Sequence, residues 1–197
     1  IPIDPTERAH HIKGFGYFSD ASMIGICRLD DQAILADPIQ NPDIERLAHA
    51  LRTRQTKTLA SGIDVIMADL KDSMEAPPTS IDGHTHAIVF LYENPRDLML
   101  NEVGCDWLED AHAHRACLRA NETAAVIANY IRLLGYDAKS HSGAASDVDL
   151  NKLALTSGLV WADQGELIAP YIGKNFGLGV ITTTLDLATD RPLAPRV

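Results

Sequence analysis

Four of the eight histidines stand in two His-x-His pairs, a spacing that could bring imidazoles together on a metal ion. His84 and His86 open an apolar run, and strand geometry points residues two apart to one face. His112 and His114 repeat the spacing, so the two segments would have to meet to bind a metal. No cysteine or carboxylate completes a recognised ligand spacing, and i, i+2 residues of a helix do not face each other. Polar residues at the ends of elements are therefore the favoured interpretation, and a small metal-binding protein is the alternative.

A serine–histidine cluster at Ser140, His141 and Ser142 is the second candidate for chemistry. A hydrolase of the α/β type would need its serine on a sharp strand-to-helix turn, and no such motif surrounds these residues. The carboxylates that follow are predicted to form a solvated acidic face rather than a catalytic pair: Asp147, Asp149, Asp163 and Glu166.

The three cysteines are Cys27, Cys105 and Cys117, which are far apart and form no Cys-x-x-Cys pair. The local clustering that is typical of zinc and iron–sulfur sites is therefore missing. Free thiols in a reducing, cytoplasmic setting are the simplest interpretation.

The composition excludes several classes of protein. The chain has 197 residues, of which 46% are hydrophobic and 22% charged, so it can bury one sizeable core. A net charge of -10 and a pI near 5.1 argue against nucleic acid or an anionic membrane as a partner. No apolar run approaches the roughly 20 residues that cross a bilayer, and no signal peptide is present.

Hydrophobic periodicity predicts an irregular mixture of helices and strands. Strands are expected over 21–29, 63–68, 84–92, 136–141 and 176–185, and helices over 43–54, 97–103, 106–134 and 149–156. Loops are expected over 37–42, 75–80 and 158–170. Strict βαβ alternation is absent, which favours an α+β fold with a mixed sheet flanked by helices. Three parts follow: an N-terminal arm leading into a short helix (1–20), one domain (21–188) and a C-terminal linker (189–197).

A series of short motifs resembles a known family. The helix and strand of AAVIANYIRLLGYDAKSH, beginning at Ala124, are followed by Ser157-Gly-Leu, Gly165-Glu-Leu-Ile-Ala-Pro and Val180-Ile-Thr-Thr-Thr-Leu-Asp-Leu. This order resembles the corrinoid-binding domain of reductive dehalogenases and of the related epoxyqueuosine reductases. The earlier segments Met23–Cys27 and Ala87–Leu91 fit the same layout.

The resemblance implies an oxidoreductase with a nitroreductase-like fold. It implies a cobalamin cofactor, reductive removal of halide from an organohalide, and two iron–sulfur clusters in a ferredoxin-like segment downstream that would deliver electrons. The start at Ile1 and the proline-rich tail fit a piece of a longer protein that packs against a second domain or forms a homo-oligomer.

The sequence departs from the family pattern at several positions. The family's glycine-rich loop is replaced by residues 158–165, in which Val160, Trp161 and Asp163 are expected to crowd a corrinoid. No tyrosine lies between residues 106 and 118, where the family has its proton donor. These departures suggest a degenerate, non-catalytic copy. The catalytic candidates carried over from the family are His112, His114 and Lys174, the last in place of the usual arginine. The cofactor-binding candidates are Ser142, Gly143, Gly158, Leu159, Gly165 and Tyr171.

Two further functions remain open at this stage. A flavin nitroreductase would share the fold, but it would need a basic cluster for the flavin phosphate, which the sequence does not show. A cofactor-free interaction module would present an exposed apolar patch, for which the loop around Trp161 is the candidate.

Overall fold

The computed structural model describes residues 4–41, 80–94, 103 and 111–193. The helices are α1 (Pro5–Phe18), α5 (Ala111–Leu133) and α6 (Leu150–Thr156), with a 3₁₀ turn η1 at Asp31–Ala33. The strands are β1 (Met23–Arg28), β2 (Ile34–Ile39), β3 (His86–Glu93), β4 (Ala138–His141), β5 (Ser146–Val148), β6 (Trp161–Asp163), β7 (Glu166–Ile168) and β8 (Phe176–Thr183). No helix in these ranges is long and apolar enough to span a membrane.

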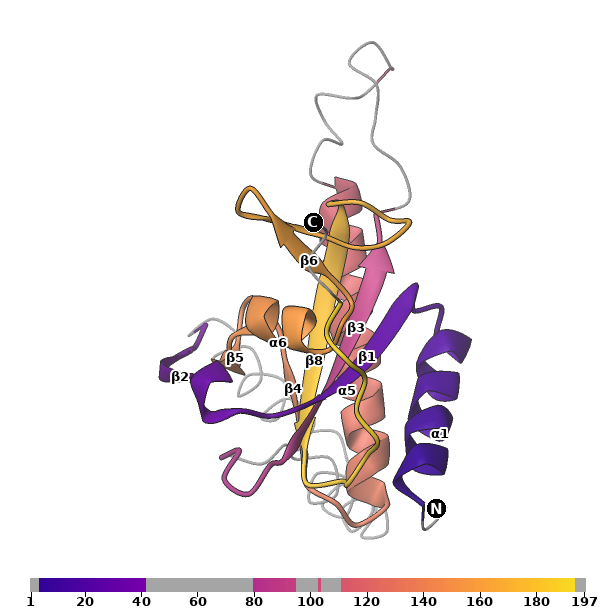
Figure 1. Cartoon of the computed structure of the whole chain (residues 1–197), viewed down its shortest axis with the longest axis vertical. Helices are drawn as coiled ribbons and strands as arrows, with labels where there is room; N and C mark the ends of the chain where they lie inside the picture. The colour runs from indigo at the N-terminus through magenta and orange to yellow at the C-terminus, as the bar shows by residue number, and fades with distance from the viewer. Residues whose placement is uncertain (1–3, 42–79, 95–102, 104–110, 194–197) are drawn as a thin grey trace, which may run out of the picture.

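The centre of the fold is a four-stranded sheet in the order β1-β3-β8-β4 (Figure 1). The prediction of an α+β fold is confirmed. A mixed sheet was expected, whereas every pairing among the described strands is antiparallel. Two small two-stranded sheets, β2-β5 and β6-β7, lie beside the central one. β3 is fully buried over its apolar residues because strands cover both of its edges and apolar layers cover both of its faces.

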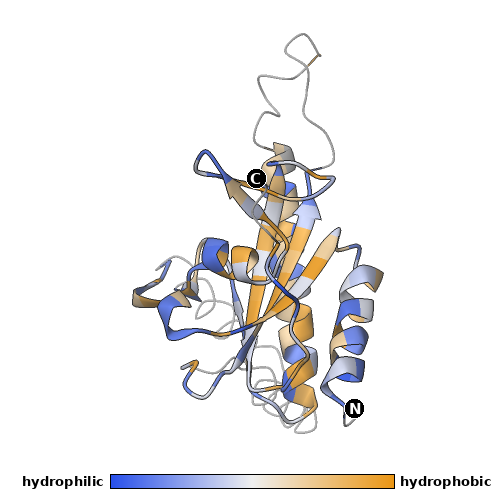
Figure 2. Ribbon diagram, in the orientation of Figure 1, coloured by the Kyte–Doolittle hydropathy of each residue, from blue (hydrophilic) through white to orange (hydrophobic). Residues whose placement is uncertain are grey.

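Helices α1 and α5 cover one face of the sheet, and α6 lies on the other face (Figures 1 and 2). The buried stripe of α5 includes Ala120, Ala124, Ile127, Ala128 and Ile131. The helical spacing in the sequence predicts a stripe of Ala124, Ile127, Ala128, Ile131 and Leu134, of which the first four are buried as expected. The helix ends before Gly135, whose φ of +89° suits the residue after a helix. The small residues at the start of the stripe let α5 approach the sheet closely.

Residues 1–20 were expected to be an arm leading into a short helix, but most of them form the 14-residue helix α1. The Asp4 side chain accepts a hydrogen bond from the Thr6 amide, and Pro5 opens the first turn, which together start the helix. Ala9 and Ile12 are buried against the sheet. The N-terminal segment is thus part of the core.

Part of the expected C-terminal linker is also fixed to the domain. The Asp190 amide donates to the Ile26 carbonyl at 2.7 Å, and the Asp190 carboxylate accepts from the Ile26 amide at 2.8 Å. Lys13 Nζ lies 2.7 Å from both carboxylate oxygens. One residue therefore ties the tail to both α1 and β1.

Two expected loops contain strands: β2 occupies part of 37–42, and the β6-β7 hairpin occupies part of 158–170. Several expected elements lie outside the described residues: the helix at 43–54, the helix at 97–103 except for Val103, the strand at 63–68, the loop at 75–79 and the first residues of the helix at 106–134. Cys105 lies outside them too.

Candidate functional site

An open cleft of about 620 Å³ lies where β8 begins. Five short segments line it: Cys117 of α5, Gly143 after β4, Leu150 and Asn151 at the start of α6, Gly165–Leu167 of the β6-β7 hairpin, and residues 174–176 and Leu178 leading into β8. This volume is within the ordinary range of small-molecule and cofactor sites.

The cleft wraps around one edge of the sheet. β3 pairs with β8 along its whole length, but β4 pairs only with Val180–Thr183. The first half of β8 therefore has no strand on the β4 side among the described residues. Cys117 reaches the cleft from the α5 face, and Leu150 reaches it from the α6 face.

Glycine brings α5 against this part of β8. A Cβ at Gly177 would lie 2.5 Å from the Cys117 amide nitrogen, and one at Gly179 would lie 2.3 Å from the Ala120 carbonyl oxygen. Only residues without a side chain allow this approach. The glycines of β8 thus place the Cys117 end of α5 at the cleft wall.

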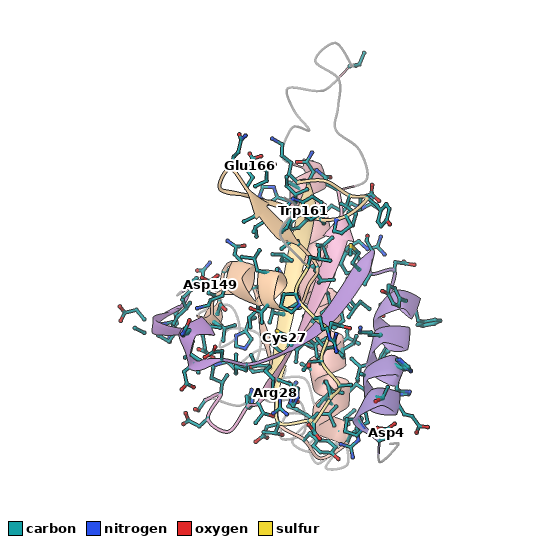
Figure 3. All side chains as sticks on the ribbon, viewed as in Figure 1. Asp4, Cys27, Arg28, Asp149, Trp161 and Glu166 are labelled. Carbon is teal, nitrogen blue, oxygen red and sulfur yellow. The ribbon has the colours of Figure 1, made fainter. Side chains whose placement is uncertain are left out.

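The charges on the cleft wall are balanced. Lys174 Nζ lies 3.4 Å from Glu166 Oε1, and both side chains are exposed. Glu166 is near the outer end of the hairpin (Figure 3). An exposed pair of this kind contributes little to stability. The remaining described lining residues are apolar or neutral, so the cleft suits an uncharged, polar ligand surface better than a phosphate.

Three predicted site residues line this cleft: Gly143, Gly165 and Lys174. Ser142 is next to it, in a tight turn in which its hydroxyl accepts from the Ala144 and Ala145 amides. The structure thus brings together four candidates that are spread over residues 142–174 of the sequence.

The other predicted cofactor-binding residues lie elsewhere. Gly158 has a φ of +74°, and a Cβ there would meet the Arg191 carbonyl oxygen, so this glycine makes room for the tail. Leu159 is buried in the core on the α6 face. Tyr171 has a φ of +68° and a fully exposed side chain in the loop before β8. None of the three is among the lining residues of the cleft.

The two helical histidines are in the first turn of α5. His114 is exposed, and the side chain of His112 is outside the described part. Cys117, one turn further along, was not predicted as a site residue, although its spacing of three from His114 places it on a neighbouring part of the helix surface. Phe176 and Leu178 were also missed, because strand residues with apolar side chains carry no chemical signal.

Val160, Trp161 and Asp163, which were expected to crowd a corrinoid, are not among the residues that line this cleft. Val160 is buried in the core on the α6 face, and Trp161 is half-buried at the base of the hairpin (Figure 3). Trp161, the candidate for the exposed apolar patch of an interaction module, is thus only partly exposed.

Two buried histidines, His84 and His141, are linked by hydrogen bonds through Thr182 of β8. His84 Nδ1 and His141 Nε2 each lie 2.8 Å from Thr182 Oγ1, and the Asp147 amide donates to His141 Nδ1 at 3.3 Å. That last bond fixes the proton of neutral His141 on Nε2, which donates to Thr182, whose hydroxyl then donates to His84. Burial lowers the pKa of His141 to about 4 and also lowers the pKa of His84.

The fourth histidine of the pairs, His86, makes a different set of contacts. Its Nδ1 lies 2.9 Å from Thr85 Oγ1, and its Nε2 lies 3.6 Å from Asp186. Burial lowers its pKa. Among the residues described, no group of three or more histidine, cysteine or acidic side chains is arranged to hold a metal ion.

Comparisons with known proteins identify relatives through structure. No protein-family model matches the sequence, and no curated protein matches it significantly. The catabolic reductive dehalogenase NpRdhA has a TM-score of 0.71 and 34% identity, covering 100% of this chain and 22% of that chain. A solved structure described as suggesting a mechanism for B12-dependent dehalogenation gives the same values, 0.71 and 34%.

More distant structures share the fold alone. An epoxyqueuosine reductase bound to a tRNA stem loop has a TM-score of 0.54 at 11% identity, over 95% of this chain and 48% of that one. The enzyme from Bacillus subtilis has a TM-score of 0.52 at 11% identity, over 96% of this chain and 48% of its own. The chain thus spans about a fifth of the dehalogenase and about half of the epoxyqueuosine reductases. The resemblance to the reductive dehalogenase family that the motifs predicted is confirmed, and it extends over the whole of this chain.

Proposed function

We propose that this chain is a corrinoid-binding domain of a reductase and that the cleft beside β8 is the binding site. The observation that carries the proposal is the cleft itself, which lies at the uncovered edge of β8 in a chain similar to a B12-dependent dehalogenase. A bound corrinoid would supply the redox chemistry of its metal.

The residues present fit such a cofactor. Gly143 and Gly165 have open space where a Cβ would stand, so the backbone at two sides of the cleft can approach a large flat ring. Phe176 and Leu178 add apolar surface, and Leu150 adds more from α6. The cleft is open, so it would cover one side of the ring and leave the remainder for other parts of a longer protein.

The reaction that we infer for the whole protein is reductive removal of halide from an organohalide. The chain covers only 22% of the dehalogenase, so iron–sulfur clusters and an electron donor would belong to a segment outside it. Within the cleft, Lys174 is the one cation among the described lining residues, and its partner Glu166 holds it at the rim. There it would orient a bound group and hold a proton.

We further propose that this chain is a degenerate copy of the domain, which holds a corrinoid or packs against a catalytic domain but does not itself catalyse the reaction. The support is the composition of the cleft, whose described lining contains no tyrosine or histidine to donate a proton. His114 is exposed in α5. For His112 or His114 to donate a proton, the start of α5 would have to face the bound ring.

Binding can be tested with hydroxocobalamin, gel filtration and the visible spectrum of the protein peak. We expect co-elution near one to one for the unmodified chain. Gly143→Trp should abolish it, because the indole would fill the cleft from a position with no neighbouring atoms within 4 Å. Gly14→Trp, on the exposed side of α1, is the matched control and should retain the cofactor. A colourless peak from the unmodified chain would refute the proposal, and a yellow purified protein would indicate a flavin instead.

A further inference from the structure

The uncovered half of β8 presents main-chain hydrogen-bonding groups to the cleft. On the β3 side, the Asn94 amide donates to the Asn175 carbonyl and the Thr85 amide donates to the Thr183 carbonyl. On the β4 side, the Thr184 amide donates to the Asp137 carbonyl. Odd-numbered residues of β8 therefore bond to β3, and even-numbered residues face the β4 side.

This alternation fixes which groups are left over. Val180 and Thr182 pair with β4, but Phe176 and Leu178 lie beyond its end. Their two N–H groups and two carbonyls point towards the cleft that the same residues line, and no described strand pairs with them. Main-chain groups that a ligand covers need partners, because an unsatisfied buried group costs about 1 to 3 kcal/mol.

We propose that this strand edge binds the carboxamide groups of the corrinoid. The inference rests on the proposed function and deepens it. A corrin ring carries acetamide and propionamide side chains, and each amide combines a carbonyl acceptor with N–H donors. An amide can therefore accept from the N–H and donate to the carbonyl of a strand residue, as the main chain of a neighbouring strand does.

The charge of the cleft supports neutral amides as the ligand groups. Lys174 and Glu166 neutralise each other at the rim. The opposite edge of the sheet is different, because Asp190 already pairs with Ile26 of β1 through both its amide and its carboxylate. The edge at Phe176 and Leu178 thus has main-chain groups that no strand in the described part of the chain pairs with, and a cleft beside them.

Two corrinoids separate the amide contribution from ring binding. Dicyanocobinamide keeps the carboxamides and lacks the nucleotide tail, whereas heptamethyl cobyrinate carries methyl esters, which accept hydrogen bonds but cannot donate them. We expect the unmodified chain to bind the amide compound about tenfold more tightly than the ester, which corresponds to one or two hydrogen bonds.

A substitution in the strand removes one main-chain donor. Leu178→Pro eliminates the outward N–H, while the bonds to β3 are made by Gly177 and Gly179 and remain. It should weaken the binding of dicyanocobinamide and of the ester alike, each about tenfold, because amide and ester carbonyls both accept a hydrogen bond from this N–H. Leu178→Ala keeps the N–H and controls for the lost side chain, so it should bind both compounds more tightly than Leu178→Pro does.

Hydrogen exchange gives a readout without any substitution, should Leu178→Pro fail to fold. Dicyanocobinamide should slow exchange of the Phe176 and Leu178 amides, because its carboxamide carbonyls accept hydrogen bonds from these N–H groups. Equal binding of both corrinoids with no added protection would overturn the strand-edge inference and leave the proposed function intact. Failure of the unmodified chain to bind either corrinoid would overturn both. Protection of the same amides by an unstructured peptide, but not by dicyanocobinamide, would replace the corrinoid with a strand-forming partner.

Discussion

At the scale of single residues, the buried pair His84 and His141 makes stability depend on pH. Both share the Thr182 hydroxyl, and the groups facing them are Asp82, Asp137, Lys139 and Asp147. The pKa of His141 is about 4 in the folded chain, against about 6.5 in an unfolded one. Below pH 6.5 the unfolded state binds more protons, so stability is full above that pH and is lost as pH falls towards 4.

The expected loss from His141 is about 2 kcal/mol between pH 7 and pH 5. Urea unfolding at the two pH values measures it, and His141→Gln should remove most of the difference while it keeps an amide donor for Thr182. His10→Gln, at an exposed position of α1, should leave the pH dependence unchanged. Equal pH dependence in His141→Gln and the unmodified chain would contradict the assignment.

A second residue-scale prediction concerns the thiols. Burial raises the pKa of the Cys27 thiol to about 12, whereas Cys117 is exposed at the cleft wall. A maleimide should therefore modify Cys117 rapidly and Cys27 only on unfolding. Peptide mass mapping of the labelled chain checks this, and rapid labelling of Cys27 in the folded protein would show that the core on the α6 face opens.

At the scale of elements, the contact between α5 and β8 depends on glycine. A Cβ at Gly179 would overlap the Ala120 carbonyl, which belongs to a helix backbone that cannot turn aside. We expect Gly179→Ala to destabilise the fold by about 3 kcal/mol in urea unfolding. Gly14→Ala, in α1 with open space around it, should instead stabilise by about 0.5 to 1 kcal/mol. A loss below 0.5 kcal/mol at Gly179 would mean that α5 shifts freely on the sheet.

Elements with a long, regular pattern of apolar residues were predictable from the sequence, and elements that are short or weakly patterned were not. β3 and β8 are eight-residue strands of nearly continuous apolar or β-branched residues, and α5 has a regular buried stripe. The β6-β7 hairpin was missed because its strands have three residues each and its turn is Gln164-Gly165 rather than Asn-Gly. β2 was missed because Asp37-Pro38 is typical of a loop. An edge strand tolerates proline, since the missing N–H can face away from its partner strand.

Only part of the site was predictable from the sequence, because main-chain groups as well as side chains form it. Gly143, Gly165 and Lys174, which line the cleft, were named through the family resemblance: Gly165 opens one of its motifs, and the other two closely follow motifs. Phe176 and Leu178 contribute main-chain groups, which are the same for every residue type except proline. Their availability depends on where β4 ends, and that is a property of the folded sheet.

At the scale of the whole molecule, Asp190 joins α1 and β1 to the C-terminal segment. Asp190→Ala removes an ion pair and a hydrogen bond to a main-chain amide, so we expect it to destabilise the chain by about 1 to 3 kcal/mol. Asp163→Ala, at an exposed position of the hairpin, should change stability by less than about 0.5 kcal/mol. The two thermal midpoints measure the difference, and equal midpoints would show that the tail contributes nothing to the fold.

The strand order also determines when this domain can fold during its synthesis. β8 is the last strand described in the chain, yet it lies between β3 and β4 in the sheet. Until residue 183 has left the ribosome, β1 and β3 form a two-stranded pair with one open edge, and α5 has no β8 to cover. The nascent chain therefore exposes one edge of the apolar strand β3 for as long as residues 94–183 are being made. Release of a product truncated just before Phe176 would yield an aggregating polypeptide rather than a smaller domain.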